Sequence, residues 1–557
     1  MIEDSGTITL LPNLTDYNDG FRVFRGSISS GTTITGTGTL LKQGLDTVTM
    51  ANTGTSWSGN NASRIDSGEL ILDFTVNNDG KIPSNVALDM RGGRLTIQGN
   101  DNSTSVQNVA SFTLANGGQN TIAINPGAGQ TAILDLGAIT RNAAHGTLRY
   151  LPQPGSSLKT STANGAHGLL GASAYLTIKD DTGTWFARND GGNNIVPFIS
   201  TVKNDIATWV AGDHVSSSAG FTGSLANGIL LGSLRFDSPI GSSLSMPTHA
   251  GFGIDSGGIL ITDSVGVGAP GIFGGTLSTT SNDVIIRHDG AADFTLSSNI
   301  RLTSAVTKAG NGTLKLSGNN TFSGVLNIQG GTLIAAGGNA IGDNAPVTLS
   351  DDHVSTFELH ASETIGRLSG GNSTTGLNLL ATVNIGAHTL TINQTGANTA
   401  FGGFFTGSGT IIKNGFGTNT NLNIQNISTG FTGKVVVNEG LFQMSSIGQI
   451  DATSFTVNRN GVLLIDNNGG TRSGTRILDT ATVTLNSANG AFSGETRPRG
   501  LALRTDQDST TNTSETIGVL TFDSGATYGD VDNSGGISSR PTLNTAKFIR
   551  HNSPTIN

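Results

Sequence analysis

Residues 306–333 read VTKAGNGTLKLSGNNTFSGVLNIQGGTL, and this stretch decides the fold. Short apolar side chains alternate with polar ones, and Gly or Asn interrupts them at short intervals. The pattern is typical of short β-strands separated by tight turns. One such unit cannot bury its own apolar face, so it must stack on another like it. We expect six side chains to point inward: Leu314, Leu316, Phe322, Leu326, Ile328 and Leu333.

Two further stretches repeat this unit. Residues 412–441 read IKNGFGTNTNLNIQNISTGFTGKVVVNEGL, and residues 41–70 read LKQGLDTVTMANTGTSWSGNNASRIDSGEL. Each copy has a Lys two residues before a Gly, an aromatic residue before Ser/Thr-Gly, and a closing Leu. The Lys and the closing Leu are 28, 25 and 28 residues apart in chain order, which indicates a repeat with small loop insertions. The lysines are Lys42, Lys308 and Lys413, and the aromatic residues are Trp57, Phe322 and Phe431.

The best copy resembles a known family of repeats. Residues 308–333 follow the pattern K-x-G-x-G-T-L-x-L-S-G-x-N-T-aromatic-S/T-G, then a strand and G-G-T-L. This is similar to the autotransporter-associated β-strand repeat of bacterial surface and secreted passenger proteins. Three other stretches are similar to the surroundings of such repeats: residues 168–190, 231–239 and 257–278. The resemblance implies a right-handed parallel β-helix outside a bacterial cell, and it implies no particular chemistry.

Composition agrees with an all-β solenoid. Of the 557 residues, 80 are glycine and only 12% are charged, while apolar residues recur at strand spacing along the chain. Disordered chains usually carry more charge and fewer β-branched residues. Windows that combine good helix formers with an amphipathic stripe are absent from the sequence, so we expect almost no helix. The predicted fold is a right-handed parallel β-helix.

Charge and cysteine content exclude several classes of function. The chain has no cysteine, which rules out disulfides and thiolate metal sites. Its net charge is −9 and its basic residues form no cluster, so nucleic acid is not an expected partner. The first residues, MIEDSGTITLLPN, do not have the pattern of a signal peptide, and no long apolar run predicts a membrane span.

The regularity of the strand pattern divides the chain into four parts. Residues 1–150 are predicted to form N-terminal solenoid coils, and residues 151–231 an irregular region that carries Trp185, Trp209 and Tyr175. Residues 232–475 contain the best repeats, and residues 476–557 are predicted to form terminal coils with a polar cap or tail. We interpret the aromatic residues of the irregular region as a small core.

Two motifs resemble catalytic or nucleotide-binding signatures. Residues 253–258, GIDSGG, place Ser256 as in a trypsin-like nucleophile motif, but Ile254 interrupts the motif and no double barrel is predicted. Residues 266–271, GVGAPG, fit G-x-G-x-x-G, yet Pro270 and the following strand pattern exclude the helix that a phosphate site needs. Both are interpreted as turns.

Carboxylates are the residues that β-helical enzymes place on one face for acid/base cleavage of polysaccharides. The candidate clusters are Asp180, Asp181 and Asp190, and Asp351, Asp352 and Glu358. Metal ligands are less evident, because the nine histidines show no H-x-x-x-H spacing. The histidines are His145, His167, His214, His249, His288, His353, His360, His388 and His551.

Residues 528–538, YGDVDNSGGIS, resemble half of a calcium loop. Asp530, Asp532 and Ser534 stand at its first, third and fifth positions and Gly535 at its sixth, but Pro541 replaces the final acidic ligand. An Asp/Asn/Gly turn explains the same residues. We therefore predict no catalytic, cofactor-binding or metal-binding residue and no cofactor.

The favoured function is a non-catalytic extracellular structural or adhesive surface protein, a rigid β-helical rod for display, adhesion or assembly. The expected partners are cell-surface or extracellular-matrix components, including polysaccharide, and the expected location is the bacterial surface or its surroundings. One alternative is a β-helix that binds or cleaves polysaccharide. A second is a filament subunit that associates end to end through open solenoid ends.

Overall fold

The computed structural model describes most of the chain: residues 7–10, 20–23, 25–57, 62–115, 117–142, 145–247, 250–266, 268, 270–371, 380–415, 420–467, 475–486, 500–504, 514–523, 529–532 and 542–550. These residues are almost entirely β-strand and turn, with one 3-10 turn, η1 (Ile206–Thr208). Within these ranges there is no α-helix, and no helix is suited to spanning a bilayer. The parallel β-solenoid predicted from the repeat is confirmed.

The chain divides into two compact units. The first comprises Met1–Leu314, Asn327–Gly331 and Ser350–Val354, and the second comprises Lys315–Leu326, Thr332–Leu349 and Ser355–Asn557. Three strands contain residues of both units: β36 (Thr313–Leu316), β37 (Leu326–Ile328) and β38 (Gly331–Ala335).

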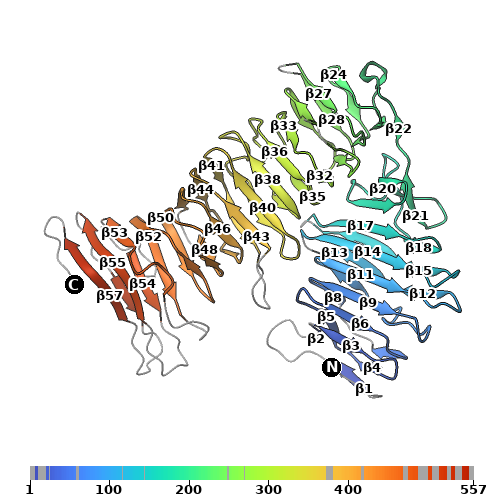
Figure 1. Ribbon diagram of the computed structural model, residues 1–557, viewed down its shortest axis with the longest axis horizontal. Coiled ribbons are helices and arrows are strands. Elements are labelled where there is room, and N and C mark those ends of the chain that lie inside the picture. The colour runs from blue at the N-terminus through green and yellow to red at the C-terminus, as the bar shows by residue number, and fades with distance from the viewer. Residues whose placement is uncertain are drawn as a thin grey trace. The chain divides into compact units, whose positions relative to one another are not determined.

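The first unit begins with a run of coils whose strands form parallel sheets (Figure 1). Its largest sheet contains β3 (Gly26–Ile28), β6 (Thr47–Met50), β9 (Glu69–Asp73), β11 (Gly93–Gln98), β14 (Gln119–Asn125), β17 (Thr147–Pro152), β19 (Leu176–Asp180), β20 (Gly183–Asn189) and β21 (Ile195–Phe198). A six-stranded sheet contains β2 (Gly20–Val23), β5 (Thr39–Lys42), β8 (Ser63–Ile65), β10 (Leu88–Met90), β13 (Ser111–Leu114) and β16 (Ala138–Arg141). Two three-stranded sheets complete the run: β1 (Thr7–Leu10), β4 (Thr33–Gly36) and β7 (Thr55–Trp57), and β12 (Ser105–Asn108), β15 (Ala132–Asp135) and β18 (Ser156–Lys159).

A second run of coils in the same unit is also parallel. One series contains β22 (Thr201–Val202), β23 (His214–Ser217), β26 (Ser233–Phe236), β29 (Gly258–Ile261), β32 (Asp283–His288) and β35 (Ala305–Ala309). A second contains β24 (Thr222–Ser224), β27 (Ser243–Ser245), β30 (Gly271–Phe273) and β33 (Phe294–Leu296), and a third contains β25 (Leu230–Leu231), β28 (Gly251–Ile254), β31 (Thr276–Ser278) and β34 (Asn299–Ile300).

The two runs are joined by a segment whose strands run antiparallel. β19 pairs with β20 through a hairpin in which Asp180 faces Gly183, and β20 pairs with β21. Every other pairing among the described strands β1 to β35 is parallel. The chain therefore leaves the coil geometry at residues 176–198, inside the region whose strand pattern is irregular.

Residues of the first run contact residues later in the sequence within the first unit. Asp283, whose side chain is fully buried, forms an ion pair with Arg141 at 2.6 Å. Gln119 Oε1 accepts a hydrogen bond from Gly310 N at 2.7 Å, and Thr147 Oγ1 donates one to Gln329 Oε1 at 2.6 Å. These residues lie more than 140 positions apart in the sequence.

The second unit continues the strand pattern. Its strands are β39 (Pro346–Leu349), β40 (Ser355–Leu359), β41 (Glu363–Ile365), β42 (Arg367–Gly370), β43 (Ala381–Asn384), β44 (Thr389–Asn393), β45 (Thr399–Phe401), β46 (Phe404–Thr406), β47 (Thr410–Asn414), β48 (Asn421–Ile424), β49 (Ile427–Ser428), β50 (Lys434–Met444), β51 (Gln449–Ile450), β52 (Ser454–Asp466), β53 (Thr482–Asn486), β54 (Gly500–Arg504), β55 (Ser514–Asp523), β56 (Gly529–Asp532) and β57 (Thr542–Arg550).

A ladder of asparagine side chains runs along this unit. Four Nδ2–H···Oδ1 hydrogen bonds of 2.6 to 2.9 Å connect neighbouring members, each one coil from the next. Stacking identical amides in register satisfies both the donor and the acceptor of each inner member. The members are Asn393, Asn414, Asn438, Asn458 and Asn486.

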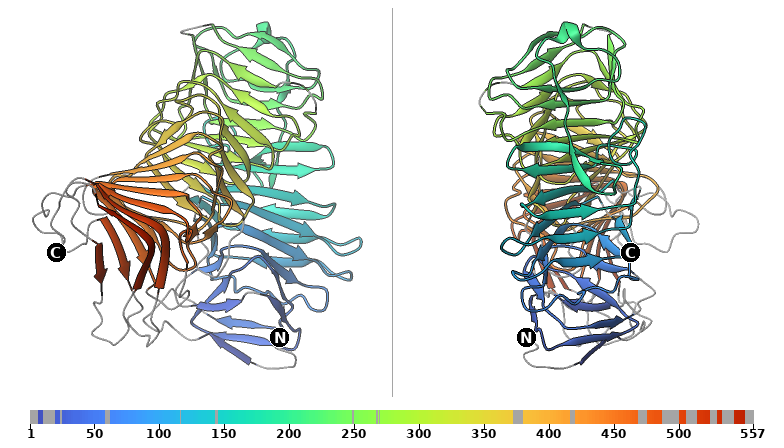
Figure 2. Two further views of the ribbon diagram at one scale, coloured as in Figure 1. Left: turned by 60° about the vertical axis from the view of Figure 1, so that its left-hand side comes forward. Right: turned by 90° about the vertical axis from the view of Figure 1, so that its right-hand side faces the viewer.

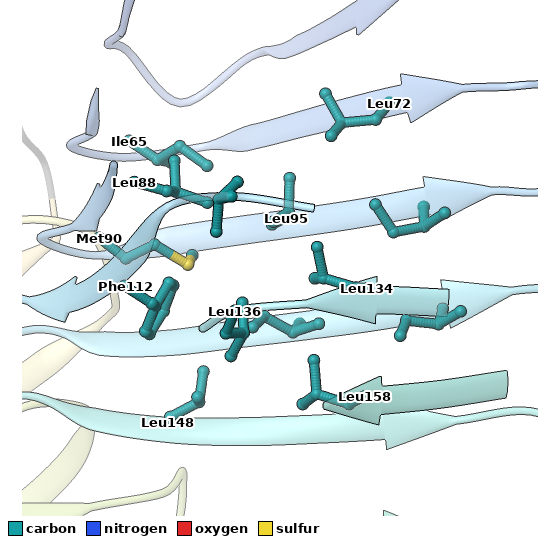
Figure 3. Close-up of a cluster of buried hydrophobic side chains, with 14 of the residues drawn as sticks. Ile65, Leu72, Leu88, Met90, Leu95, Phe112, Leu134, Leu136, Leu148 and Leu158 are labelled. Carbon is teal, nitrogen blue, oxygen red and sulfur yellow. The ribbon is translucent and has the colours of Figure 1, made fainter. Parts of the chain in front are cut away.

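The core lies inside the coils and is formed by aliphatic side chains stacked from one coil to the next. Figure 3 shows part of it in the first unit, where Leu88, Leu95 and Leu134 turn toward the same interior. The strands that carry these side chains are coloured blue to teal in Figure 2. The six inward positions of the repeat, Leu314, Leu316, Phe322, Leu326, Ile328 and Leu333, are each at most 1% exposed, which confirms the predicted strand phase.

A glycine of the repeat is required by the close approach of neighbouring coils. Gly310 has φ +79°, in the region that side chains rarely adopt, and a Cβ built on it would lie 2.4 Å from His288 O. The turn that follows Lys308 can therefore form only with glycine at this position.

Candidate binding groove

A groove of about 600 Å³ opens in the first unit where the coils give way to the antiparallel segment. Its lining comes from β17, β18, β19 and β21 and from the turns beside them. Buried side chains form its base: Tyr150, Leu158, Ile178 and Ile195. Its volume lies within the range of ligand-binding clefts in proteins.

All three carboxylates of the first candidate cluster line this groove: Asp180, Asp181 and Asp190. Asp180 Oδ1 accepts hydrogen bonds from Thr182 N at 2.8 Å and Thr182 Oγ1 at 2.6 Å. Asp181 is exposed, in the loop of the β19–β20 hairpin. Among the residues described, none of the three carboxylates forms an ion pair with a cationic side chain.

Asp190 is held ionised by its own turn. Its Oδ2 accepts a hydrogen bond from Asn194 Nδ2 at 2.9 Å, and its Oδ1 accepts bonds from Gly192 N at 2.7 Å and Asn194 N at 3.0 Å. The Asn194 side chain, followed by the Gly192 N–H, lowers the pKa of Asp190 below its usual value. The groove therefore carries fixed negative charge at neutral pH.

Prolines give the groove apolar surface, beside polar lining residues that include Gln153 and Ser157. Pro152, Pro154 and Pro197 line it, and the Tyr150 hydroxyl is engaged with Ser156 Oγ at 3.0 Å. Burial raises the pKa of Tyr150 to about 12, so this ring stays neutral. The groove thus combines apolar walls with negative charge, and sequence spacing did not predict this combination.

The lysines that mark the repeat have a structural role that the sequence pattern did not predict. Lys308 is fully buried, and its Nζ donates to Gly310 O at 2.6 Å and to Gly330 O at 2.8 Å. Lys42 Nζ is bonded in the same manner to Gly44 O at 2.7 Å and to Ser67 O at 3.0 Å. Lys413, also fully buried, donates to Asn414 O at 2.8 Å.

Each of these ammonium groups holds its turn through backbone carbonyls. For Lys42 and Lys308, an acceptor 22 to 25 residues ahead lies on the next coil, so the side chain also joins two coils. Burial lowers the pKa of Lys308 to about 7 and the pKa of Lys42 and of Lys413 to about 8. The lysine therefore connects the turn that contains its glycine to the closing turn of the repeat.

Comparisons with known proteins agree with this repeat. The family described as passenger-associated-transport-repeat matches residues 306–335, the coil built around Lys308. The chain is also 28% identical over 420 residues to the adhesin BmaC autotransporter of Brucella suis biovar 1 (strain 1330). The chain is autotransporter passenger-like. The match covers 70% of this passenger-like chain and 11% of the Brucella protein. No solved structure matches the passenger-like chain.

Two of the three carboxylates in the second candidate cluster of the passenger-like chain have histidine partners. Asp352, with a side chain 1% exposed, accepts a hydrogen bond from Gly93 N at 2.7 Å and pairs with His353 Nδ1 at 2.6 Å. Glu358 belongs to the second unit and pairs with His360 at 2.8 Å. Asp352 therefore connects two segments of the first unit, and Asp351 beside it is exposed.

Each of the two catalytic-like motifs of the passenger-like chain leads into a strand. Ser256 is fully buried, and its Oγ accepts a hydrogen bond from Gly258 N at 3.2 Å, directly before β29. After residues 266–271 the chain enters β30, a strand, so the helix terminus that binds phosphate is not provided. Val267 and Ala269 lie outside the described residues.

The histidines and the calcium-like stretch are the potential metal ligands of the passenger-like chain. Within the described ranges no group of three or more potential ligands is placed to hold a metal ion. His288 is fully buried, its Nε2 donates a hydrogen bond to Ala292 O at 2.8 Å, and burial lowers its pKa to about 4. Asp530 and Asp532 lie in β56, and Ser534, Gly535 and Pro541 fall outside the described residues.

Two of the three aromatic residues singled out in the passenger-like chain are core residues. Tyr175 and Trp209 are 4% and 5% exposed, and Trp209 packs edge-on against Phe221 with ring centroids 5.2 Å apart. Trp185 is only partly buried, and the Arg235 guanidinium lies 3.9 Å from its ring centre. Tyr175 belongs to the extended core of the first coils, Trp209 packs against Phe221, and Trp185 forms a cation–π contact with Arg235.

Proposed function

We propose that this chain is an adhesive segment of an extracellular surface protein that is exposed on, or released from, a bacterial cell. The observation that carries the proposal is the similarity over 420 residues to a protein named an adhesin. The passenger-associated repeat at residues 306–335 and the parallel solenoid support it. The chain spans about a ninth of the length of that relative, so the proposal concerns this segment.

The stacked coils give such a protein a stiff scaffold that presents loops and grooves along its flank. The expected partners are components of cell surfaces or of the extracellular matrix. A role in binding, without catalysis, agrees with the use of buried polar groups: Asp283, Asp352 and Lys308 are all engaged in holding segments of the chain together.

Attachment of coated beads tests this proposal. Fluorescent beads that carry the purified chain are applied under flow to cultured cells and to wells coated with single matrix proteins or polysaccharides. Beads coated with heat-unfolded chain and beads coated with albumin are the controls. We expect the folded chain alone to give retention that survives washing.

Retention equal to that of albumin on every surface would contradict an adhesive function. The polysaccharide wells also test for catalysis. We expect the chain lengths of the polysaccharides, measured by size-exclusion chromatography, to be unchanged after incubation, and shortened products would favour an enzyme.

A further inference from the structure

The two runs of coils in the first unit share no β-sheet. Among the described strands, every sheet consists either of strands up to β21 or of strands from β22 onward. Inside each run, parallel backbone pairing and buried aliphatic side chains join successive coils. The two runs are therefore held against each other mainly by side chains.

Beside the antiparallel segment that joins the runs, this contact is apolar. Phe186 and Ala174 belong to the same buried cluster as Leu260 of the second run, and all three are at most 3% exposed. Ala174 N also donates a hydrogen bond to Ser256 O at 3.2 Å. Salt does not screen an apolar contact, so this part of the contact can remain closed and act as a hinge.

Away from this apolar cluster, charged side chains connect the two runs. Arg141 Nη2 lies 2.6 Å from Asp283 Oδ2, and His145 Nδ1 lies 3.4 Å from the same carboxylate oxygen. Arg149 Nη2 lies 3.6 Å from Asp289 Oδ2. In each pair the carboxylate belongs to the second run.

Two further pairs have the same direction. Lys179 pairs with Asp263, and His167 Nδ1 lies 2.9 Å from Asp255 Oδ2. Among the described residues, every ion pair between the runs takes its basic side chain from before residue 199 and its carboxylate from after residue 200. Ile285 of the second run adds one aliphatic contact with the core of the first. We call the three pairs formed by arginine and lysine the charge clasp.

The carboxylates of the charge clasp differ in what they keep when the runs separate. Asp283 is fully buried and otherwise accepts hydrogen bonds from Thr307 Oγ1, so without Arg141 its charge is compensated only by water. Asp289 also pairs with Arg287 of its own run at 2.9 Å and keeps that partner. Loss of Arg141 therefore favours a state in which water reaches Asp283.

We propose that the charge clasp opens, so that the two runs separate about the joining segment while the coils of each run stay folded. Partly exposed ion pairs contribute little stability and are screened by salt, whereas strand ladders and apolar cores are not. Raised ionic strength therefore favours the open form. Opening moves the far parts of the two runs apart and extends the reach of the first unit. This inference goes beyond the adhesive function and does not depend on it.

Double electron–electron resonance on the full chain tests the proposal. The chain has no cysteine, so spin labels on Val76→Cys and Thr303→Cys, both exposed, report one distance between the runs. We expect a single distance at low salt and a second, longer one that grows toward about 1 M NaCl, where the Debye length is about 3 Å. Labels on Leu45→Cys and Ala138→Cys, both exposed and both in the first run, are the control and should keep one distance.

Removal of two clasp cations tests which charges hold the runs together. Arg141→Gln combined with Arg149→Gln is expected to raise the open fraction at low salt by about fivefold or more, the effect of losing at least one ion pair. Arg64→Gln combined with Arg94→Gln makes the same change at arginines whose carboxylate partners lie inside the first run. This control is expected to leave the open fraction unchanged.

A charge swap at a more exposed pair tests the direction of the clasp. Lys179→Asp places two carboxylates together and is expected to raise the open fraction, and the addition of Asp263→Lys is expected to restore the native value. The side chains of both residues are more than a third exposed, so these variants are expected to fold.

Thermal melts followed by circular dichroism show whether each variant is folded. A native distance between the runs that is the same at every salt concentration would overturn the proposal, as would equal effects of the two arginine pairs. Lengthening of the control distance together with the first would also overturn it, because the coils would then be unfolding. If Arg141→Gln with Arg149→Gln does not fold, the salt series on the native chain and the charge swap decide.

Discussion

Lys308 Nζ donates a hydrogen bond to Gly330 O at 2.8 Å, from one coil to the next. The ammonium group is fully buried and also bonds to Gly310 O and, at 3.3 Å, to Ala309 O. Carbonyl oxygens replace the water that a lysine normally keeps, which allows a charge to lie inside the coil stack. The repeat thus retains a lysine at a position where its neighbours in the strand are apolar or small.

Replacement of Lys308 by methionine is expected to destabilise the protein. The side chain keeps its length, but the carbonyls of Gly310 and Gly330 lose their donor. An unsatisfied buried carbonyl costs about 1–3 kcal/mol, so we expect the free energy of unfolding to fall by that order. Urea unfolding measures it, and Lys315→Met, at a part-exposed position of the same repeat, is the control. A loss equal to that of the control would contradict the role of the buried ammonium.

The pKa of Lys308 also predicts how this stability changes with pH. Its pKa is about 7 in the folded chain and 10.5 in a solvated lysine. Between these values the unfolded chain holds more protons, so stability from this site rises as pH increases from about 7 to 10. The unfolding midpoint of the native protein relative to Lys308→Met should increase over this window. A constant difference across the window would show that the pKa of Lys308 is not lowered.

Glu363 has the opposite dependence. It is 2% exposed and accepts a hydrogen bond from Ala340 N at 3.0 Å, and burial raises its pKa from 4.5 to about 7. The folded chain holds more protons between these values, so the contribution of Glu363 falls as pH rises from about 4.5 to 7. Glu363→Gln removes the titrating proton. The difference between the unfolding midpoints of the variant and the native protein should therefore shift in favour of the variant as pH rises over the same window. Parallel pH profiles would contradict this assignment.

The strand phase of the repeat predicts unequal effects of two aspartate substitutions. Phe322 is 1% exposed, whereas Lys315 lies between two inward leucines and is part-exposed. Phe322→Asp buries an unpaired charge and is expected to cost about 3–5 kcal/mol or to prevent folding. Lys315→Asp is expected to be nearly silent. Equal shifts of the thermal midpoint would show that the inward face is assigned incorrectly.

The asparagine ladder predicts a loss of stability when one of its inner members is removed. Asn438 donates to Asn414 and accepts from Asn458, so Asn438→Ala breaks two hydrogen bonds and is expected to cost about 1–3 kcal/mol. Lys434→Ala, at an exposed position of the same strand, is the control. Unchanged urea midpoints for Asn438→Ala would show that the ladder does not contribute to stability.

The sequence alone determined the local structure of the coils. Alternation places Leu314 and Leu316 on one face of a strand whatever the rest of the chain does, and Gly310 can adopt a turn that other residues resist. These are properties of a few adjacent residues. The all-β solenoid and its buried positions could therefore be predicted from the repeat and its periodicity.

Only the tertiary structure decided which polar residues meet. Lys308 resembles a surface lysine in the sequence, and its burial depends on where the next coil places Gly330. The groove joins residues near 150, 180 and 195, and the ion pair of Arg141 with Asp283 spans 142 positions. Such contacts depend on the lengths of the intervening turns and on the departure of the chain into antiparallel strands, which no local pattern specifies.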